Sequence, residues 1–388
     1  MVDWHSYQKR NCWNYYNWKE GYEMKKVKGL VASILLVIIV GIFLIHTEEK
    51  NTDITKDKTK VGMILNGSIH DQSWGTSHYE GLENCVEELN LLVEYRENVP
   101  ADKTCLVVME ELIEEGCEII ICNSFGFGEW VLQAAEKYPD IYFFHATGTG
   151  AKDNLSTYFG RMYQMRYLSG IVAGLQTESN EIGYVAAFPI DEVNRGINAF
   201  TLGVRKVNPE ATVYVRFSNS WESEEDARGA TERLLLEHEI DVLAMHVDTN
   251  VPLEIAEEKG LWAIGYNYDN GEVYKNSFLT APVWQWDEFY APRILDCLQD
   301  KFFGKNYWED ADTGILSLAP LTDNVKNGIA EVVEEERQKL ESGSWDVFFG
   351  PIKDQEGNVI VQEGESMTDD AMLNAFDWYV EGVVIDAE

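Results

Sequence analysis

Short apolar segments alternate with segments of helical periodicity between residues 60 and 265, and this alternation constrains the fold more than any other feature. The apolar segments predict strands at 61–65, 119–122, 141–145, 182–187, 212–217, 242–246 and 262–265. Helical spacing fills the intervals at 78–92, 110–115, 130–137, 196–207, 227–238 and 252–259. Strands separated by helices pack as parallel sheets with helices on their faces. We therefore predict an α/β protein with two similar doubly wound lobes, divided near residues 177–181.

Polar and aromatic residues gather where these predicted strands end. The segments DQSW, SFGFG, ATGTG, FPID, NSWE, VDTN and YNYD follow the strands in that order. In open α/β sheets, ligands bind at the carboxyl ends of the strands, where loops present helix N-termini and backbone donors. Aromatic rings can enclose a planar heterocycle while carboxylates accept from its N–H groups. The pattern favours a nucleobase or nucleoside as ligand.

Ten residues at these positions are candidates for ligand contact. They are Asp71, Trp74, His78, Ser124, Phe125, Phe188, Trp221, Asp248, Asp269 and Trp284. Several have alternative roles that the sequence leaves open. Asp71 could cap the helix that begins near residue 77, and His78 could satisfy a neighbour in the first turn of that helix. Trp74 could anchor the edge of a lobe, and Phe125 and Phe188 could pack at the hinge.

An uncharged apolar run at 29–45 follows Lys25, Lys26 and Lys28, which predicts a membrane segment whose positive flank stays in the cytoplasm. A signal peptide shares this pattern, but no A-x-A cleavage site or lipid-accepting cysteine follows. We therefore predict a cytoplasmic segment at 1–28, an uncleaved anchor at 29–46 and a flexible linker at 47–59. We also expect translation to begin at Met24. The body from residue 60 onwards should lie on the extracytoplasmic side of the cell membrane.

The composition narrows the classes of partner and chemistry. A formal net charge of −36 argues against nucleic acid as a partner. Six cysteines show no paired CxxC spacing, so neither a disulfide scaffold nor a zinc site is predicted. Seven histidines occur without HExxH, and GxSxG and GxxxxGK[ST] are also missing from the sequence. We therefore predict a binding protein without catalytic residues, metal or cofactor.

An ordered series of motifs over residues 60–385 resembles the BMP (basic membrane protein) family of ABC-transporter substrate-binding proteins. The motifs are DQSWGTSHYEGL from Asp71, RMYQMRYLSGIVAG from Arg161, IGYVAAFPIDEVNRGINAFTLGVRKVNP from Ile182, HVDTNVPLEIAEEKG from His246, APVWQWDEFY from Ala281, WDVFFGPIKDQEGN from Trp345 and DWYVEGV from Asp377. The resemblance implies a type I periplasmic-binding-protein fold, with lobe 1 at 60–177, lobe 2 at 178–280 and crossover segments at 281–388. It also implies hinge closure on a ligand and partnership with an ABC permease and its ATPase subunits. A membrane-anchored sensor that uses the same fold is the alternative.

The resemblance further implies that the purine is held by the aspartate after the first strand and by nearby aromatic residues, a position that Asp71 and Trp74 occupy. The sequence departs from the family's nucleoside binders in three places. Trp74 and His78 stand where those members carry a Phe-Asn type loop. Residues 281–286 lack the lysine that reaches the sugar in those members, and the loop that usually reads Asp-x-Asp is Asn267-Tyr268-Asp269. We therefore expect a purine nucleobase, adenine-like, in preference to a nucleoside.

Overall fold

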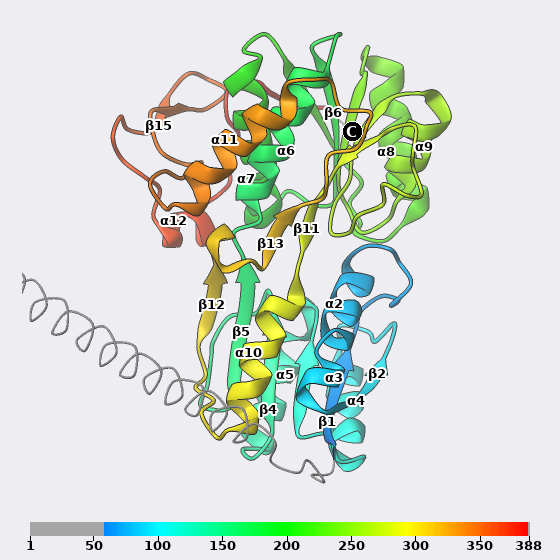
Figure 1. Cartoon of the computed structure of the whole chain (residues 1–388), viewed down its shortest axis with the longest axis vertical. Helices are drawn as coiled ribbons and strands as arrows, with labels where there is room; N and C mark the ends of the chain where they lie inside the picture. Colours follow the sequence, from blue (N-terminus) through cyan, green and yellow to red (C-terminus); the bar gives the residue numbers. More distant parts are fainter. Residues whose placement is uncertain (1–57, 387–388) are drawn as a thin grey trace, which may run out of the picture. The chain divides into compact units, whose positions relative to one another are not determined.

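Residues 58–386 are the part of the chain that the computed structural model describes. The predicted segment at 1–28, the predicted anchor at 29–46, Cys12 and most of the predicted linker at 47–59 lie outside these residues. Within 58–386, no helix combines the length and the apolar character needed to cross a bilayer. The predicted doubly wound lobes are both present in this part of the chain (Figure 1).

Lobe 1 is built on a parallel sheet with the strand order β12-β5-β4-β3-β1-β2, counting the strands within residues 58–386. Its strands are β1 (Thr59–Ile64), β2 (Leu91–Arg96), β3 (Ile119–Cys122), β4 (Tyr142–Ala146), β5 (Leu155–Gly160) and β12 (Asn306–Glu309). Its helices are α2 (Trp74–Glu83), α3 (Val86–Leu89), α4 (Lys103–Glu114), α5 (Gly128–Lys137) and α10 (Trp286–Leu298). Every residue of β3 is buried, which explains its continuous apolar sequence, because helices cover both faces of a parallel sheet.

Lobe 2 repeats this plan with the order β10-β9-β8-β6-β7-β16 among the described strands. Its strands are β6 (Glu181–Ala186), β7 (Thr212–Phe217), β8 (Val242–His246), β9 (Trp262–Ile264), β10 (Phe278–Thr280) and β16 (Val383–Ile385). Its helices are α6 (Tyr163–Gln176), α7 (Asp191–Val207), α8 (Glu224–Glu237), α9 (Val251–Lys259), α11 (Ile329–Glu341) and α12 (Asp369–Asn374). Acidic residues begin α7 and basic residues end it, which complements the helix dipole.

The described chain passes between the lobes three times (Figure 1). It crosses from β5 to α6, then from β10 through β11 (Pro282–Trp284) to α10, and finally from β12 to β13 (Leu316–Leu318). Strands β11 and β13 pair in antiparallel fashion between the two large sheets. A separate small hairpin, β14 (Ile352–Lys353) with β15 (Val359–Val361), follows in the C-terminal part. The three crossings join the lobes at a common hinge.

Helices α6 and α7 pack against each other in lobe 2 through glycines. A Cβ built on Gly170 would come within 2.0 Å of the Phe200 carbonyl oxygen, and one on Gly203 within 2.0 Å of the Tyr167 carbonyl oxygen. Such contact requires residues without side chains, since the two backbones touch. The sequence division near 177 placed α6 in lobe 1, whereas its packing on α7 places it in lobe 2. The first crossing therefore lies at residues 160–163.

Candidate functional site

A cleft of about 310 Å³ lies between the loops that follow β1 in lobe 1 and those that follow β7 and β8 in lobe 2. Its lining includes five carboxyl side chains, namely Asp71, Glu222, Glu224, Asp248 and Glu254. Among the described residues that line it there is no lysine or arginine. Two of the ten candidates, Asp71 and Asp248, thus meet across the lobes. The carboxyl ends of the strands of both sheets face this cleft, as the parallel topology predicts.

Asp71 holds the loop that leads into α2. Its carboxylate accepts hydrogen bonds from the backbone N–H groups of Ser73, Gly75 and Thr76 at 2.8–2.9 Å, and from the Thr76 hydroxyl at 2.9 Å. The capping role that the sequence left open is therefore present in the structure. Because Asp71 also lines the cleft, capping fixes the position of a carboxylate that faces the opposite lobe.

Asp248 and Glu222 are carboxyl groups of lobe 2 that line the cleft and interact with the charge of Asp71. Burial, together with the charges of Asp71 and Glu222, raises the pKa of Asp248 well above its ordinary value. Burial and Asp71 also raise the pKa of Glu222, although its hydrogen bond from Asn66 works in the opposite direction. That bond, from Asn66 Nδ2 to Glu222 Oε1 at 2.7 Å, joins the two lobes. Three carboxyl groups in so small a space favour a ligand that donates hydrogen bonds.

Trp74, the first residue of α2, packs against a cluster of other aromatic rings. Trp284 and Trp286 stack with centroids 4.4 Å apart, and Trp286 stacks on His78 at 4.3 Å. The Trp74 ring stands edge-on to all three, at 5.8, 5.6 and 4.3 Å. Its Nε1–H donates to the backbone carbonyl of Asn123 at 2.9 Å. The half-buried indole of Trp74 is thereby held in one orientation, with part of its surface accessible.

His78 differs from the prediction that it contacts ligand, because its side chain is fully buried within this aromatic stack. Its Nδ1 hydrogen-bonds with the Tyr290 hydroxyl at 2.5 Å. Burial lowers the pKa of His78 well below its ordinary value. The hydrogen bond to Tyr290 matches the alternative that the sequence left open, in which His78 satisfies a neighbouring group.

The aromatic candidates of lobe 2 follow β6 and β7. Phe188 and Trp221 are half-buried and in edge-to-face contact at 6.1 Å, and Trp221 also lies 6.0 Å from His246. His246 ends β8, and its Nε2 is 3.2 Å from Glu192 Oε1. Burial first, and then the nearby charge of Arg166, lowers the pKa of His246 to about 4. Phe188, Trp221 and His246 therefore form a small aromatic group in lobe 2.

The remaining candidates differ in burial and in their contacts. Trp284 is nearly buried, and its Nε1–H donates to Asn267 Oδ1 at 3.0 Å. The backbone carbonyl of Ser124 hydrogen-bonds with His145 Nε2 at 2.8 Å. Phe125 is 68% exposed, and the exposed Asp269 accepts from the Gly271 N–H at 3.0 Å within its own turn. Phe125 and Asp269 thus differ from the others in facing solvent.

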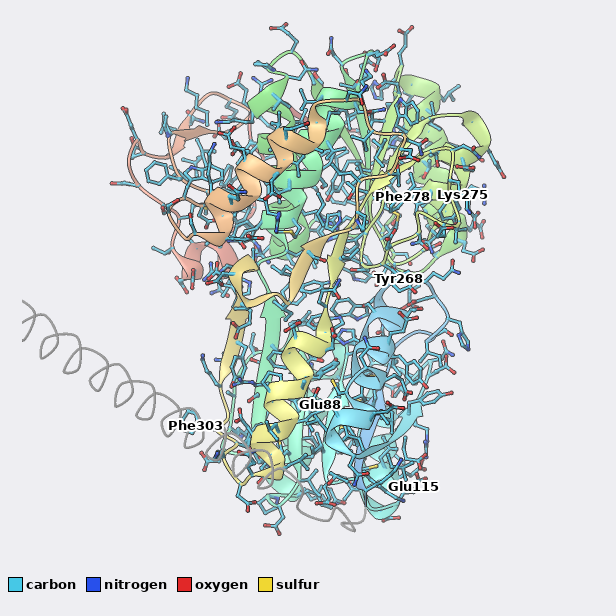
Figure 2. All side chains as sticks on the ribbon, in the orientation of Figure 1. Glu88, Glu115, Tyr268, Lys275, Phe278 and Phe303 are labelled. Atoms are coloured by element: carbon cyan, nitrogen blue, oxygen red, sulfur yellow. The ribbon has the colours of Figure 1, made fainter. Side chains whose placement is uncertain are left out.

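Sequence reasoning missed several polar side chains at the cleft or in contacts between the lobes. Asn123 is fully buried, its Oδ1 accepts from the Asn66 N–H at 3.0 Å, and its Nδ2 has no partner among the described residues. Asn250 Nδ2 donates to the Asp71 carbonyl at 3.3 Å, across the lobes. The Tyr268 hydroxyl, at the junction of the lobes in Figure 2, donates to Glu80 at 3.2 Å. Asn66, Asn123 and Glu222 each end or follow a predicted strand, and that position was the available signal.

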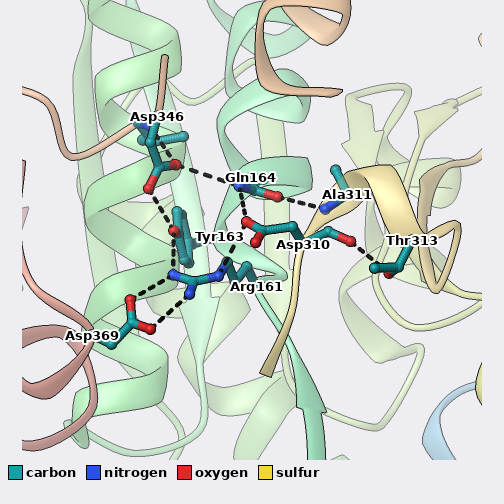
Figure 3. A network of polar contacts seen from close by, with 9 residues as sticks. Arg161, Tyr163, Gln164, Asp310, Ala311, Thr313, Asp346 and Asp369 are labelled. Atoms are coloured by element: carbon teal, nitrogen blue, oxygen red, sulfur yellow. Dashed lines mark hydrogen bonds and ion pairs between the residues drawn. The ribbon is translucent and has the colours of Figure 1, made fainter. Parts of the chain in front are cut away.

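A charged network ties the crossings together at the hinge (Figure 3). Arg161, which follows β5, forms a two-pronged ion pair with Asp369 at 2.8 and 3.0 Å, and its Nε is 3.1 Å from Asp310. Gln164 donates to Asp310 at 3.1 Å and accepts from the Ala311 N–H at 2.9 Å. Arg161 therefore joins the first crossing to the third, as a hinge-organising residue would.

One cluster of described residues has metal-ligating atoms close enough for an ion, namely Glu237, His238 and Asp386 at the edge of lobe 2. Arg216 Nη2 already lies 2.8 Å from Glu237 and 2.9 Å from Asp386. The guanidinium supplies the positive charge that these carboxylates need. This ion-pair network connects the C-terminal end of β16 to the rest of lobe 2.

Comparison with known proteins identifies the family. The model of a family described as "ABC transporter substrate-binding protein PnrA-like", Bmp, matches residues 58–346. A purine-binding protein of Brucella abortus is 32% identical over 333 residues, which cover 84% of this chain and 93% of that protein. A putative ABC transporter glucose-binding protein of Haloferax volcanii is 35% identical over 317 residues, covering 81% of this chain and 78% of the relative.

Solved structures share the fold at lower identity. A transcriptional activator of the comK gene from Bacillus halodurans has a TM-score of 0.65 at 23% identity, over 74% of this chain and 99% of its own. An ABC transporter solute-binding protein from Conexibacter woesei has a TM-score of 0.63 at 19% identity, over 74% and 98%. The periplasmic-binding-protein architecture is thus present, and this family binds solutes without catalysing a reaction. The chain belongs to the Bmp family of ABC transporter substrate-binding proteins.

Proposed function

We propose that this chain captures a purine nucleobase, adenine-like, in the cleft between its lobes and delivers it to an ABC permease and its ATPase. The observation that carries the proposal is a cleft between the lobes that is lined by carboxyl groups and, among the described residues, lacks lysine and arginine. A phosphate would face the carboxylates of Asp71 and Glu222, so nucleotides are disfavoured. A neutral flat base that donates N–H groups suits both features.

Stacking is the first contact in this proposal. Trp74 offers a fixed indole on lobe 1, and Phe188 and Trp221 offer rings on lobe 2. A base held by Trp74 would recruit the lobe 2 rings as the lobes close, and the differential contacts of the closed state would shift the hinge equilibrium. The carboxyl groups of Asp71 and Asp248 would then accept from the base's N–H donors. The name of the Brucella abortus relative agrees with this ligand class.

Calorimetry on the full chain in mild detergent tests the proposal. The titrants are adenine, guanine, hypoxanthine, xanthine and their nucleosides, together with glucose, which the name of the Haloferax volcanii relative suggests. We expect adenine to bind at micromolar or lower concentration and its nucleoside more weakly. Glucose binding without any purine binding would overturn the purine assignment, and so would the failure of every base below millimolar concentration.

Replacing Trp74 by alanine should weaken adenine binding by about 1–3 kcal/mol, roughly 5- to 150-fold in affinity, because one stacking face is lost. The exposed ring of Phe125 is the matched control, and Phe125→Ala should bind as wild type does. Calorimetry compares the two variants. Equal affinities for Trp74→Ala and wild type would show that the indole serves the packing of lobe 1 alone.

Asp248→Asn should raise the stability of the unliganded protein while weakening adenine binding. Burial beside Asp71 and Glu222 makes the Asp248 carboxylate costly, which its raised pKa reflects, and the amide removes that cost. The same change converts one acceptor oxygen into a donor, which opposes a ligand N–H group. Thermal unfolding and calorimetry measure the two effects, with the exposed Asp269→Asn as the control. A destabilised Asp248→Asn protein would contradict this account.

A sensor without a transporter is the second candidate, and one comparison favours it. The transcriptional activator protein med of Bacillus subtilis is 24% identical over 304 residues, which cover 77% of this chain and 95% of that protein. An extracytoplasmic location and the proposed N-terminal anchor are compatible with both roles. Reconstitution with candidate permease and ATPase subunits separates the two roles. Adenine-dependent stimulation of ATP hydrolysis supports delivery, whereas stable binding without any stimulation supports sensing.

A further inference from the structure

Asn267 joins three parts of the molecule through one buried amide. It follows β9 in lobe 2 and is 1% exposed. Its Nδ2 donates to Asp248 Oδ1 at 2.8 Å and to Ser73 Oγ, on lobe 1, at 3.0 Å. Its Oδ1 accepts from Trp284 Nε1–H, on the second crossing, at 3.0 Å. One side chain thus contacts both lobes and the hinge.

The chemistry of these partners fixes the orientation of the amide. The indole N–H of Trp284 can only donate, so the Asn267 atom that faces it must be the oxygen. The two hydrogens on Nδ2 then point towards Asp248 and Ser73. All the side-chain hydrogen-bonding atoms of Asn267 have partners, which is what a buried polar network requires.

The backbone of Asn267 is fixed as well. Its N–H donates to the Pro282 carbonyl at 2.9 Å, and it bridges to Val283 on the second crossing. Its φ of +66° lies in the left-handed region, which asparagine tolerates and β-branched residues avoid. The side chain therefore leaves a rigid point beside the hinge.

We propose that Asn267 is a positioning residue that sets the Asp248 carboxyl and the Trp284 indole relative to Ser73, so that the ligand site is assembled only when the lobes are closed. The inference rests on the proposed function for its ligand and goes beyond it in assigning this role. It also gives a reason why the loop that usually reads Asp-x-Asp begins with Asn267 in this chain. A carboxylate at position 267 would repel the carboxylate of Asp248. Asp269, the acid that remains in the loop, faces solvent.

Two variants separate positioning from general packing. Asn267→Gly keeps the left-handed backbone and removes all three side-chain bonds, so adenine binding should weaken about 10-fold at every pH. Asn267→Asp keeps the acceptor for Trp284 but places a carboxylate against Asp248. Its deficit should be larger at pH 8, about 100-fold, and should shrink towards pH 5, where the pair can share a proton.

Other titratable groups surround this pair and are common to all the variants. They are Asp71 after β1, Glu222 after β7, Glu192 in α7 and Tyr266 after β9. The measured quantity is therefore the ratio of variant to wild-type dissociation constants at each pH, which removes the pH dependence that both proteins share. Calorimetry on the full chain with adenine, from pH 5 to pH 8, supplies the ratios.

A second measurement does not depend on any ligand. Hydrogen exchange of backbone amides around Ser73 should be faster in unliganded Asn267→Gly than in wild type, because the lobes lose a shared bond. A pH-independent ratio for Asn267→Asp, or wild-type affinity for Asn267→Gly, would overturn the positioning role. If wild type binds no base, the proposed function fails, and the exchange rates alone decide: faster exchange supports the role, and unchanged exchange overturns it.

Discussion

Replacing Trp286 by alanine should lower the free energy of unfolding by about 3–5 kcal/mol, the range for removing a large aromatic side chain from a core. Trp286 is fully buried, and it stacks between Trp284 and His78 at 4.4 and 4.3 Å. The effect should exceed that of a lone buried ring, because both neighbours lose a stacked face. Chemical denaturation monitored by circular dichroism measures the change.

The control for this variant is Phe303→Ala, since Phe303 is 76% exposed and its removal should change stability by less than about 0.5 kcal/mol. Trp286→Phe retains a stacked ring, so its loss of stability should lie between those of Trp286→Ala and Phe303→Ala. The binding of adenine to folded Trp286→Ala should also weaken, because Trp74 loses the ring below it. A stability loss under about 1 kcal/mol would mean that the aromatic rings around Trp286 rearrange freely.

Acid should destabilise the protein between pH 6.5 and pH 4 through its buried histidines. Burial lowers the pKa of His145 to about 4, and burial with the charge of Arg166 lowers that of His246 to about 4. The unfolded chain therefore binds more protons in this interval, so stability is full above pH 6.5 and falls as the pH drops. Each histidine contributes about 3 kcal/mol over the interval. His78 acts in the same direction, and the raised pKa of Asp248 acts in the opposite direction.

Denaturant unfolding at pH 7.5, 6, 5 and 4 measures this dependence. His145→Gln and His246→Gln should each flatten it, and their effects should add, because the two residues lie in different lobes, at the ends of β4 and β8. A double variant with the pH dependence of wild type would show that other groups control acid unfolding.

Much of the fold followed from periodicity, because a buried parallel strand is apolar throughout and a covering helix is apolar on one side. The strand at Ile119–Cys122 is an example. The edge strand β2 (Leu91–Arg96) and the strand β5 (Leu155–Gly160) were not predicted, since neither has a clear pattern of apolar residues in its sequence. The placement of α6 depended on its glycine contacts with α7, which no local pattern shows.

The candidate site was predictable where position on a strand decided it, and unpredictable where distant contacts did. Asp71 and Asp248 reach the cleft because both follow strands of parallel sheets. His78 is withdrawn from it by Tyr290, 212 residues away in sequence. Asn267 gains its role from Ser73, 194 residues away, and a loop sequence alone carries no sign of that partner.

The three crossings also set the order in which the molecule can be completed during synthesis. Lobe 1 begins with β1 to β5, yet it receives α10 and β12 only after the strands β6 to β10 of lobe 2 have been made. Trp286 therefore joins Trp74 and His78 late in synthesis. Strand β12 joins the edge of the lobe 1 sheet later still. Because domains fold as units when their last segment is available, lobe 1 starts first and finishes after most of lobe 2. A nascent chain ending before residue 286 would leave Trp74 and His78 without the ring of Trp286.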